Sequence, residues 1–208
     1  MNRDRTSLRG EVPEVRRRRR PETSITTPRR GREDVFLRPG EYFVGDARHP
    51  IRSMLGSCVT VTLWCDQPRV AAMSHFLRAS RHVGESDIDD VRGLDLGKLD
   101  ARYGDEALHL MLHELERRSV VALRCKAKSF GGGNMFRARN PQAQDAIGRR
   151  NGEVARALLQ ARGSEVVSES PYGDGHRQIA CDVGTRDVWA RLLPRGACAY
   201  NLRMGETT

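Results

Sequence analysis

Residues 55–64 read LGSCVTVTLW and residues 70–76 read VAAMSHF, and these two runs set the fold around them. The first alternates polar and apolar residues after Cys58, a pattern typical of a β-strand, and the second is short and apolar. The sequence DQPR at 66–69 has the composition of a turn, so we predict an antiparallel hairpin. Cys58 then begins the first strand and His75 ends the second, which places both side chains at the same open end.

A thiol beside an imidazole is the arrangement of a cysteine nucleophile with a general base. An ion pair between them would raise the thiolate fraction of Cys58 above the few per cent of an ordinary thiol. The alternative is structural, because an isolated strand cysteine is usually a small core residue and a single histidine is usually exposed or satisfied in the core. Ser57 is a weaker nucleophile than Cys58 and is expected to make a turn hydrogen bond. The backbone amide of Cys58 is the candidate oxyanion donor.

The residues around both side chains separate these alternatives. LGSCVTVTLW followed by VAAMSHF resembles the signature LGSCVAV…GAMAH of the CheD family of chemoreceptor glutamine deamidases. In that family the matching cysteine is the nucleophile and the matching histidine is its partner, at the same separation. The resemblance therefore implies these roles for Cys58 and His75.

The resemblance extends over residues 35 to 195 and implies the fold as well. Strand patterns outnumber helix patterns here, which favours an α+β domain. The family resemblance implies a single-domain layered sandwich of mixed β-sheets with helices on one outer face. The further segments that are similar to family motifs are PGEY at 39–42, ARYGDEAL at 101–108, FGGGNMF at 130–136, IGRRN at 147–151 and GDGHR at 173–177.

One position departs from the family pattern. Family members carry a threonine a few residues before the nucleophile that orients the imidazole, whereas this chain has Arg52, Ser53 and Met54 there. Ser53 has a hydroxyl five residues before Cys58 and is our candidate for the orienting residue. Alternatively, its hydroxyl belongs to an ordinary turn or strand and the imidazole is held less well.

The resemblance implies a cytoplasmic, cysteine-dependent protein-glutamine deamidase that needs no cofactor or metal. Its expected substrates are methyl-accepting chemotaxis receptors, whose cytoplasmic helices form long acidic coiled coils. Some family members bind the phosphatase CheC, so a CheC-like protein is an expected partner. There are three alternatives to this function: a catalytically weak CheD-like docking module, a nucleic-acid binder that uses its arginine-rich N-terminal residues, and a thiol hydrolase with a different substrate.

Positive charge is concentrated near the N-terminus. Residues 1–32 hold eleven arginines and four acidic residues, which accounts for +7 of the formal net charge of +9. Because this stretch has few apolar residues to bury, we predict a disordered Arg-rich tail at 1–32 and a CheD-like deamidase domain at 33–208. Such a tail can attract nucleic acid, anionic lipid or an acidic protein. No aromatic residue interleaves with the arginines to stack on bases, so nucleic-acid binding is not expected.

Several patterns argue against other classes. No apolar run approaches the length of a membrane span or a signal peptide, which predicts a cytoplasmic protein without membrane insertion. The five cysteines form no C-x-x-C pair, which argues against a disulfide framework and a zinc knuckle. His109 and His113 have helical spacing for a metal but lack a third ligand nearby, so we expect solvated histidines.

The remaining elements follow from hydrophobic periodicity and turn residues. We predict a helix over 104–118, and a second helix that begins at Asn151 as its N-cap and ends before Gly163. We expect residues 78–100 to form a mobile loop near the site, and the three glycines at 131–133 to pack closely against the backbone there. The remaining predicted strands cover 35–44, 120–130, 164–168, 176–182 and 188–193.

Overall fold

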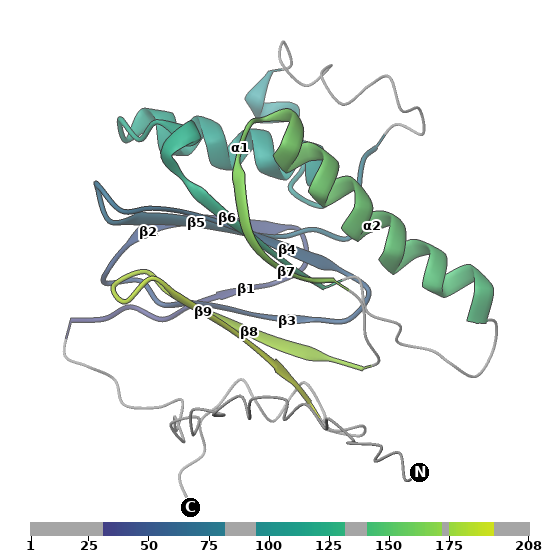
Figure 1. Ribbon diagram of the computed structural model, residues 1–208. Coiled ribbons are helices and arrows are strands. Elements are labelled where there is room, and N and C mark those ends of the chain that lie inside the picture. Colours follow the sequence, from purple (N-terminus) through teal and green to yellow (C-terminus); the bar gives the residue numbers. More distant parts are fainter. Residues whose placement is uncertain (1–30, 82–94, 132–140, 172–174, 194–208) are drawn as a thin grey trace, which may run out of the picture.

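Two β-sheets face each other, and both helices lie on the outer side of the larger sheet (Figure 1). This computed structural model describes residues 31–81, 95–131, 141–171 and 175–193. The predicted α+β sandwich with helices on one outer face is confirmed. Residues 1–30 of the predicted tail, and residues 82–94 of the predicted loop, lie outside the described residues.

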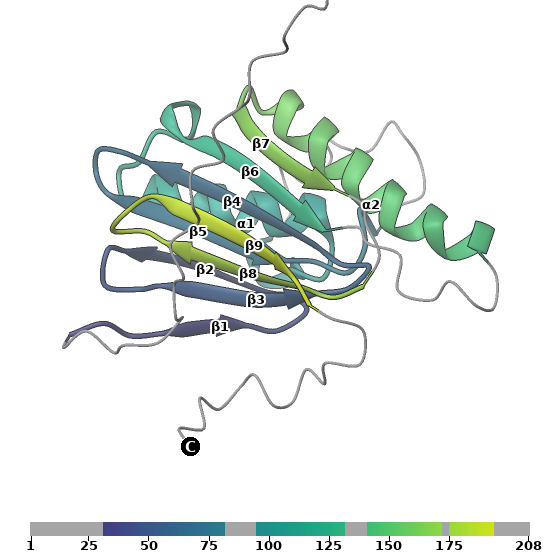
Figure 2. The same cartoon turned by 60° about the horizontal axis from the view of Figure 1, so that its bottom comes forward.

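Each sheet contains one parallel pair of strands, and its other pairs are antiparallel. The smaller sheet has the order β1-β3-β8-β9, and its strands can be followed in Figure 2. The larger sheet has the order β2-β5-β4-β6-β7. The bounds are β1 Val35–Leu37, β2 Glu41–Asp46, β3 Ile51–Leu55, β4 Val59–Cys65, β5 Val70–His75, β6 Lys126–Gly131, β7 Glu165–Pro171, β8 Arg177–Asp182 and β9 Asp187–Leu192.

The predicted hairpin is the centre of the larger sheet. β4 and β5 pair in antiparallel register, with Thr62 opposite Met73 and Cys65 opposite Val70. Alternation along β4 sends Val61 and Leu63 toward the helices, whereas the threonines between them face the smaller sheet. The hairpin therefore contributes to two cores, one under the helices and one between the sheets.

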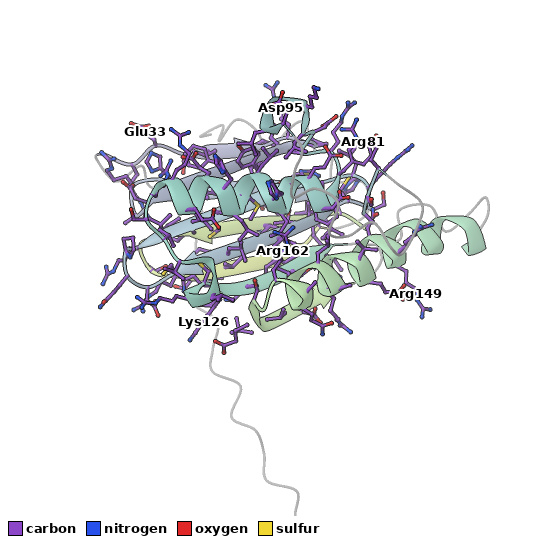
Figure 3. The ribbon with its side chains drawn as sticks, turned by 90° about the horizontal axis from the view of Figure 1, so that it is seen from above. Glu33, Arg81, Asp95, Lys126, Arg149 and Arg162 are labelled. Atoms are coloured by element: carbon purple, nitrogen blue, oxygen red, sulfur yellow. The ribbon has the colours of Figure 1, made fainter. Side chains whose placement is uncertain are left out.

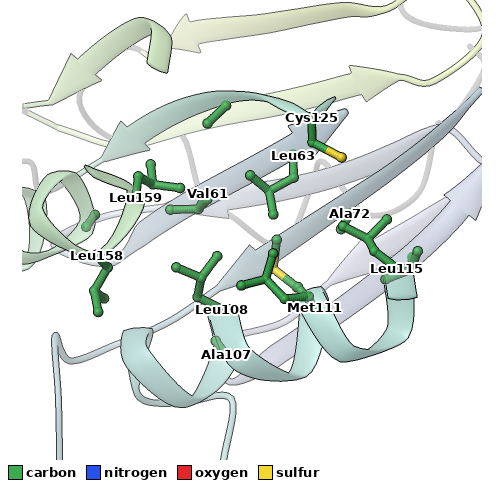
Figure 4. Packing of buried hydrophobic residues seen from close by; sticks show 14 of the residues in the cluster. Val61, Leu63, Ala72, Ala107, Leu108, Met111, Leu115, Cys125, Leu158 and Leu159 are labelled. Atoms are coloured by element: carbon green, nitrogen blue, oxygen red, sulfur yellow. The ribbon is translucent and has the colours of Figure 1, made fainter. Parts of the chain in front are cut away.

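The two helices cover the larger sheet with one apolar face each. α1 (Gly104–Arg117) packs against β2 and β5, and α2 (Pro141–Ala161) packs against β4, β6 and β7. Leu108 and Met111 of α1 and Leu158 and Leu159 of α2 belong to one core cluster between the helices and the larger sheet (Figure 4). Short 3-10 helices occur at Leu96–Lys98 and Ala122–Arg124. In the described ranges, no helix is long and apolar enough to cross a membrane.

Three predictions about the elements were wrong and one strand was missed, in ways that matter for the site. The predicted strand 35–44 is two strands in different sheets, because the chain turns at Gly40, whose φ is +85°. β3 was not predicted as a strand, and β6 is only the second half of the predicted 120–130 strand. The second helix begins at Pro141, so Asn151 lies in its middle rather than at its N-cap.

Candidate active site

The register of the hairpin brings Cys58 and His75 to the same end of the sandwich. Val59 and Phe76 form a reciprocal pair, with both N–H···O distances at 3.0 Å. Cys58 directly precedes Val59, and His75 directly precedes Phe76. Continuing the register places Thr60 opposite His75, with Cys58 two residues along the same strand face. Diagonal neighbours of this kind have Cα atoms about 7–8 Å apart and closer side chains.

Both side chains face the space between the two sheets, but they differ in exposure. His75 is buried, with 1% of its surface exposed, whereas Cys58 is half-buried. Cys58 packs against the inter-sheet core cluster that contains Ile51, Leu55 and Met73. The thiol is thus the group of the pair that a substrate reaches from solvent.

Ser53 holds the imidazole from the opposite sheet. Its Oγ lies 2.7 Å from His75 Nδ1 and 2.9 Å from the carbonyl oxygen of Leu37. Ser53 is fully buried on β3 and Leu37 lies on β1, so both belong to the smaller sheet, whereas His75 belongs to the larger one. The Ser53 hydroxyl, which the sequence offered as the candidate orienting group, therefore lies within hydrogen-bond distance of the His75 imidazole.

The two hydrogen bonds of Ser53 fix the tautomer of His75. A carbonyl oxygen only accepts, so the single hydroxyl proton of Ser53 goes to Leu37, and Ser53 Oγ must accept from Nδ1–H. In the neutral ring the other nitrogen, Nε2, then carries the lone pair. Nε2 is buried, and no hydrogen-bond partner reaches it from the described residues. An oriented imidazole with a bare Nε2 is equipped to accept a proton.

Burial favours the neutral form of both groups. It lowers the pKa of His75 to about 4, against smaller opposing effects of the Leu37 carbonyl and Glu41. Burial also raises the pKa of the Cys58 thiol, partly offset by the residue's own backbone amide. These directions oppose the resting thiolate–imidazolium pair expected from the sequence. They favour a neutral thiol that loses its proton to Nε2 only as it attacks.

The turn before Cys58 is held from two sides. Gly131 of β6 lies against the Cys58 carbonyl so closely that an added Cβ would be 2.3 Å from that oxygen, and its φ is +117°. This matches the predicted close backbone packing of the glycine run; residues 132–133 lie outside the described residues. Asn151 of α2 donates to the carbonyl oxygens of Leu77 at 2.8 Å and Ser57 at 3.4 Å. The sequence did not predict this contact, although Asn151 is the last residue of the IGRRN motif at 147–151.

Several arginines lie toward this end of the sandwich. Arg78 and Arg150 are exposed, and they lie close in sequence to Leu77 and Asn151. Viewed from above, the labelled Arg81 and Arg149 lie at the same end of the molecule (Figure 3). Arg81 donates to both carboxylate oxygens of the buried Glu106, at 2.8 and 2.9 Å. The described part of the chain contains no cluster of three His, Cys, Asp or Glu side chains placed to hold a metal.

Comparison with known proteins identifies the family. The profile described as CheD chemotactic sensory transduction matches residues 94–192. A "probable chemoreceptor glutamine deamidase CheD 2" of Albidiferax ferrireducens is 49% identical over 164 residues, covering 78% of this chain and 90% of that protein. Similar proteins of Chromobacterium violaceum (CheD 1) and Dechloromonas aromatica (CheD 3) are 35% identical over 161 residues and 34% identical over 166 residues. These matches cover 76% and 80% of this chain, and 77% and 91% of those proteins. The chain belongs to the CheD family.

Proposed function

We propose that this protein is a cysteine-dependent deamidase that converts specific glutamine side chains of methyl-accepting chemotaxis receptors to glutamate. The observation that carries the proposal is the buried His75, whose Nδ1 is held by Ser53, whose Nε2 has no partner in the described residues, and which lies diagonally across the β4–β5 register from Cys58. Relatives named as probable chemoreceptor glutamine deamidases support the choice of substrate. The reaction takes place in the cytoplasm, where those receptors expose their glutamine-bearing helices.

The first half of the reaction forms a thioester. Nε2 of His75 takes the thiol proton as Cys58 Sγ attacks the carboxamide carbon of the glutamine. The carbonyl oxygen becomes an oxyanion, and the backbone N–H of Cys58 donates a hydrogen bond to it. The imidazolium then protonates the nitrogen, the C–N bond breaks and ammonia leaves. The acyl group of the former glutamine remains bonded to Cys58.

The second half returns the enzyme to its starting state. Nε2 accepts a proton from water, and the hydroxide attacks the thioester carbon. The C–S bond then breaks, the proton returns to the Cys58 sulfur, and glutamate leaves. Because burial disfavours the imidazolium, the charged ring passes its proton on quickly in each half. A low pKa makes the ring a weaker base toward the thiol and a stronger acid toward the departing ammonia, so it favours the second of these two roles.

Ser53 bears on the docking-module alternative. That alternative rested on the absence of the family's threonine before the nucleophile. The Ser53 hydroxyl lies 2.7 Å from His75 Nδ1 and can supply the same hydrogen bond. This contact favours an active enzyme over a protein that only docks on receptors. A CheC-like phosphatase remains an expected partner, which co-purification with such a protein would test.

The decisive experiment is mass spectrometry of a receptor cytoplasmic fragment incubated with the wild-type protein and with Cys58→Ala. Cys65→Ala is the matched control, because Cys65 is a buried thiol at the far end of β4. We expect conversion of glutamine to glutamate by the wild type and Cys65→Ala, and none by Cys58→Ala. Conversion by Cys58→Ala would exclude the thioester route. Receptor binding without conversion by the wild type would favour the docking module.

A further inference from the structure

Asn151 is a buried polar residue in the middle of a helix, a position where asparagine is a poor helix former. It is 3% exposed, and its side-chain amide donates to two carbonyls that lie 74 and 94 residues away in sequence. Neither acceptor lies within the helix that carries Asn151. Its hydrogen bonds instead connect α2 to the ends of β4 and β5.

The two carbonyls flank the catalytic pair. Ser57 immediately precedes Cys58, and Leu77 follows His75 by two residues. One carboxamide therefore spans the chain segments on which the nucleophile and its base are mounted. The shorter bond, 2.8 Å to Leu77, anchors the amide, and the longer bond, 3.4 Å, reaches the peptide that joins Ser57 to Cys58.

The bond to Ser57 determines where the Cys58 amide points. A trans peptide is planar, and its C=O and N–H lie on opposite sides. With the Ser57 carbonyl turned toward Asn151, the Cys58 N–H must point away from it. Among the described residues, no backbone carbonyl accepts this N–H. The N–H is thus held beside the nucleophilic atom without a backbone acceptor.

Gly131 limits the next peptide in the same way. Its backbone lies against the Cys58 carbonyl, and a methyl group there would overlap that oxygen. The peptide before Cys58 is thus tied by a side chain from α2, and the peptide after it is packed against β6. Rotation of the Cys58 backbone is restricted from both sides.

We propose that Asn151 is a positioning residue that holds the Ser57–Cys58 peptide so that the Cys58 N–H points at the oxyanion of the reaction. The proposal rests on the proposed function, since it assigns Asn151 a part in the same acyl transfer. Asn151 touches neither substrate nor reacting atoms. Its effect is confined to steps in which a carbonyl oxygen becomes charged.

The test compares two reactions of the same thiol. Alkylation by iodoacetamide displaces iodide at a saturated carbon and forms no oxyanion, whereas deamidation forms one in each half. In Asn151→Ala and the nearly isosteric Asn151→Asp, we expect kcat for the receptor fragment to fall about 10- to 100-fold with KM unchanged. The alkylation rate of Cys58 is expected to stay within about twofold of wild type, because only the oxyanion contact is lost.

Leu158→Ala is the structural control, because Leu158 is buried on the same helix but belongs to the core under the helices. We expect it to lower thermal stability while keeping kcat per folded molecule. Equal loss of deamidation and alkylation in the Asn151 variants, or unchanged kcat, would overturn the proposal. So would failure of both Asn151 variants to fold where Leu158→Ala folds, since Asn151 would then serve stability.

A second readout does not need the receptor. Propanal labelled with ¹³C at its carbonyl adds reversibly to the thiol, and its oxygen then occupies the oxyanion position. We expect NMR to detect less of this adduct with Asn151→Ala than with wild type. Asn151-dependent capture by a wild-type protein that deamidates no receptor would refute the substrate and retain the positioning role. Deamidation with Asn151-independent capture would do the reverse.

Discussion

Ser53→Ala is the substitution that most directly tests how the imidazole is held. It removes one buried hydroxyl that accepts from His75 Nδ1 at 2.7 Å and donates to the Leu37 carbonyl at 2.9 Å. Without it, His75 loses the contact that fixes its ring orientation from the opposite sheet. The Leu37 carbonyl remains near the ring and can keep the proton on Nδ1. We therefore expect a misaligned base rather than an absent one.

The size of the effect follows from these contacts. A hydrogen bond between neutral groups contributes about 1 kcal/mol net, and a buried group left without its partner costs about 1–3 kcal/mol. Since one acceptor stays available to Nδ1–H, the lower part of this range applies. A loss of about 1–2 kcal/mol of transition-state stabilisation corresponds to a kcat lower by about 5- to 30-fold. KM should not change, because Ser53 is fully buried and away from the substrate.

The assay is the rate of glutamate formation on a receptor fragment, measured with two comparison variants. Ser53→Thr keeps a hydroxyl and should retain most of the activity. Ser74→Ala is the matched control, because Ser74 is equally buried and next to His75, but its hydroxyl has no partner in the described residues. We expect Ser74→Ala to be nearly neutral. Unchanged kcat in folded Ser53→Ala, or an equal loss in Ser74→Ala, would refute the orienting role.

Three further predictions concern titration, backbone packing and docking. The pKa of His75 is about 4 when folded and 6.5 ordinarily, so the unfolded chain binds the extra proton between these values. The free energy of unfolding should therefore decrease as the pH is lowered from 6.5 toward 4, by about 2 kcal/mol at about pH 5. Urea denaturation should show this decrease for the wild type but not for His75→Gln. Gly131→Ala should lower the free energy of unfolding by more than about 2 kcal/mol and should also lower the deamidation rate. Gly31 is also at positive φ but has no atom within 4 Å of an added Cβ, so Gly31→Ala should lower the free energy of unfolding by only about 1 kcal/mol. Equal losses in the two variants would refute the steric argument. Arg150→Glu should raise KM for an acidic receptor fragment at low salt and leave kcat unchanged, a difference that about 1 M salt should remove if the contact is electrostatic.

Local patterns predicted the central part of the fold. Alternation in LGSCVTVTLW and the turn at 66–69 predicted the β4–β5 hairpin, and the apolar face over 104–118 predicted α1. These elements are determined by neighbours a few residues apart. β3 was not predicted because it is only five residues long and its alternating pattern includes Arg52. The division of 35–44 into β1 and β2 depends on a positive φ at Gly40, which one glycine in an extended run does not reveal.

The part of the site that was predicted lies on elements that are close together in the sequence. Cys58 and His75 lie on adjacent strands of one hairpin, so the sequence brings them together. Asn151 contacts residues 74 and 94 positions away, and no local rule connects them. A signal for the true start of α2 was present, because proline is favoured in the first turn of a helix and Pro141 occupies it. Placing the helix start there would have moved Asn151 to the interior and made its polarity conspicuous.

The hydrogen bond between Ser53 and His75 joins side chains from the two facing sheets. Each sheet is internally fixed by its ladder of backbone bonds, but apolar packing sets how far one slides over the other. A displacement of a few tenths of an ångström would leave the fold intact and lengthen that 2.7 Å contact. The rate of turnover should consequently depend on how the two sheets are aligned. Substitutions of Ile51 or Met73, which pack between the sheets, should slow the enzyme although neither residue contacts a reacting atom. In such variants a slow enzyme and a stable one can be the same molecule.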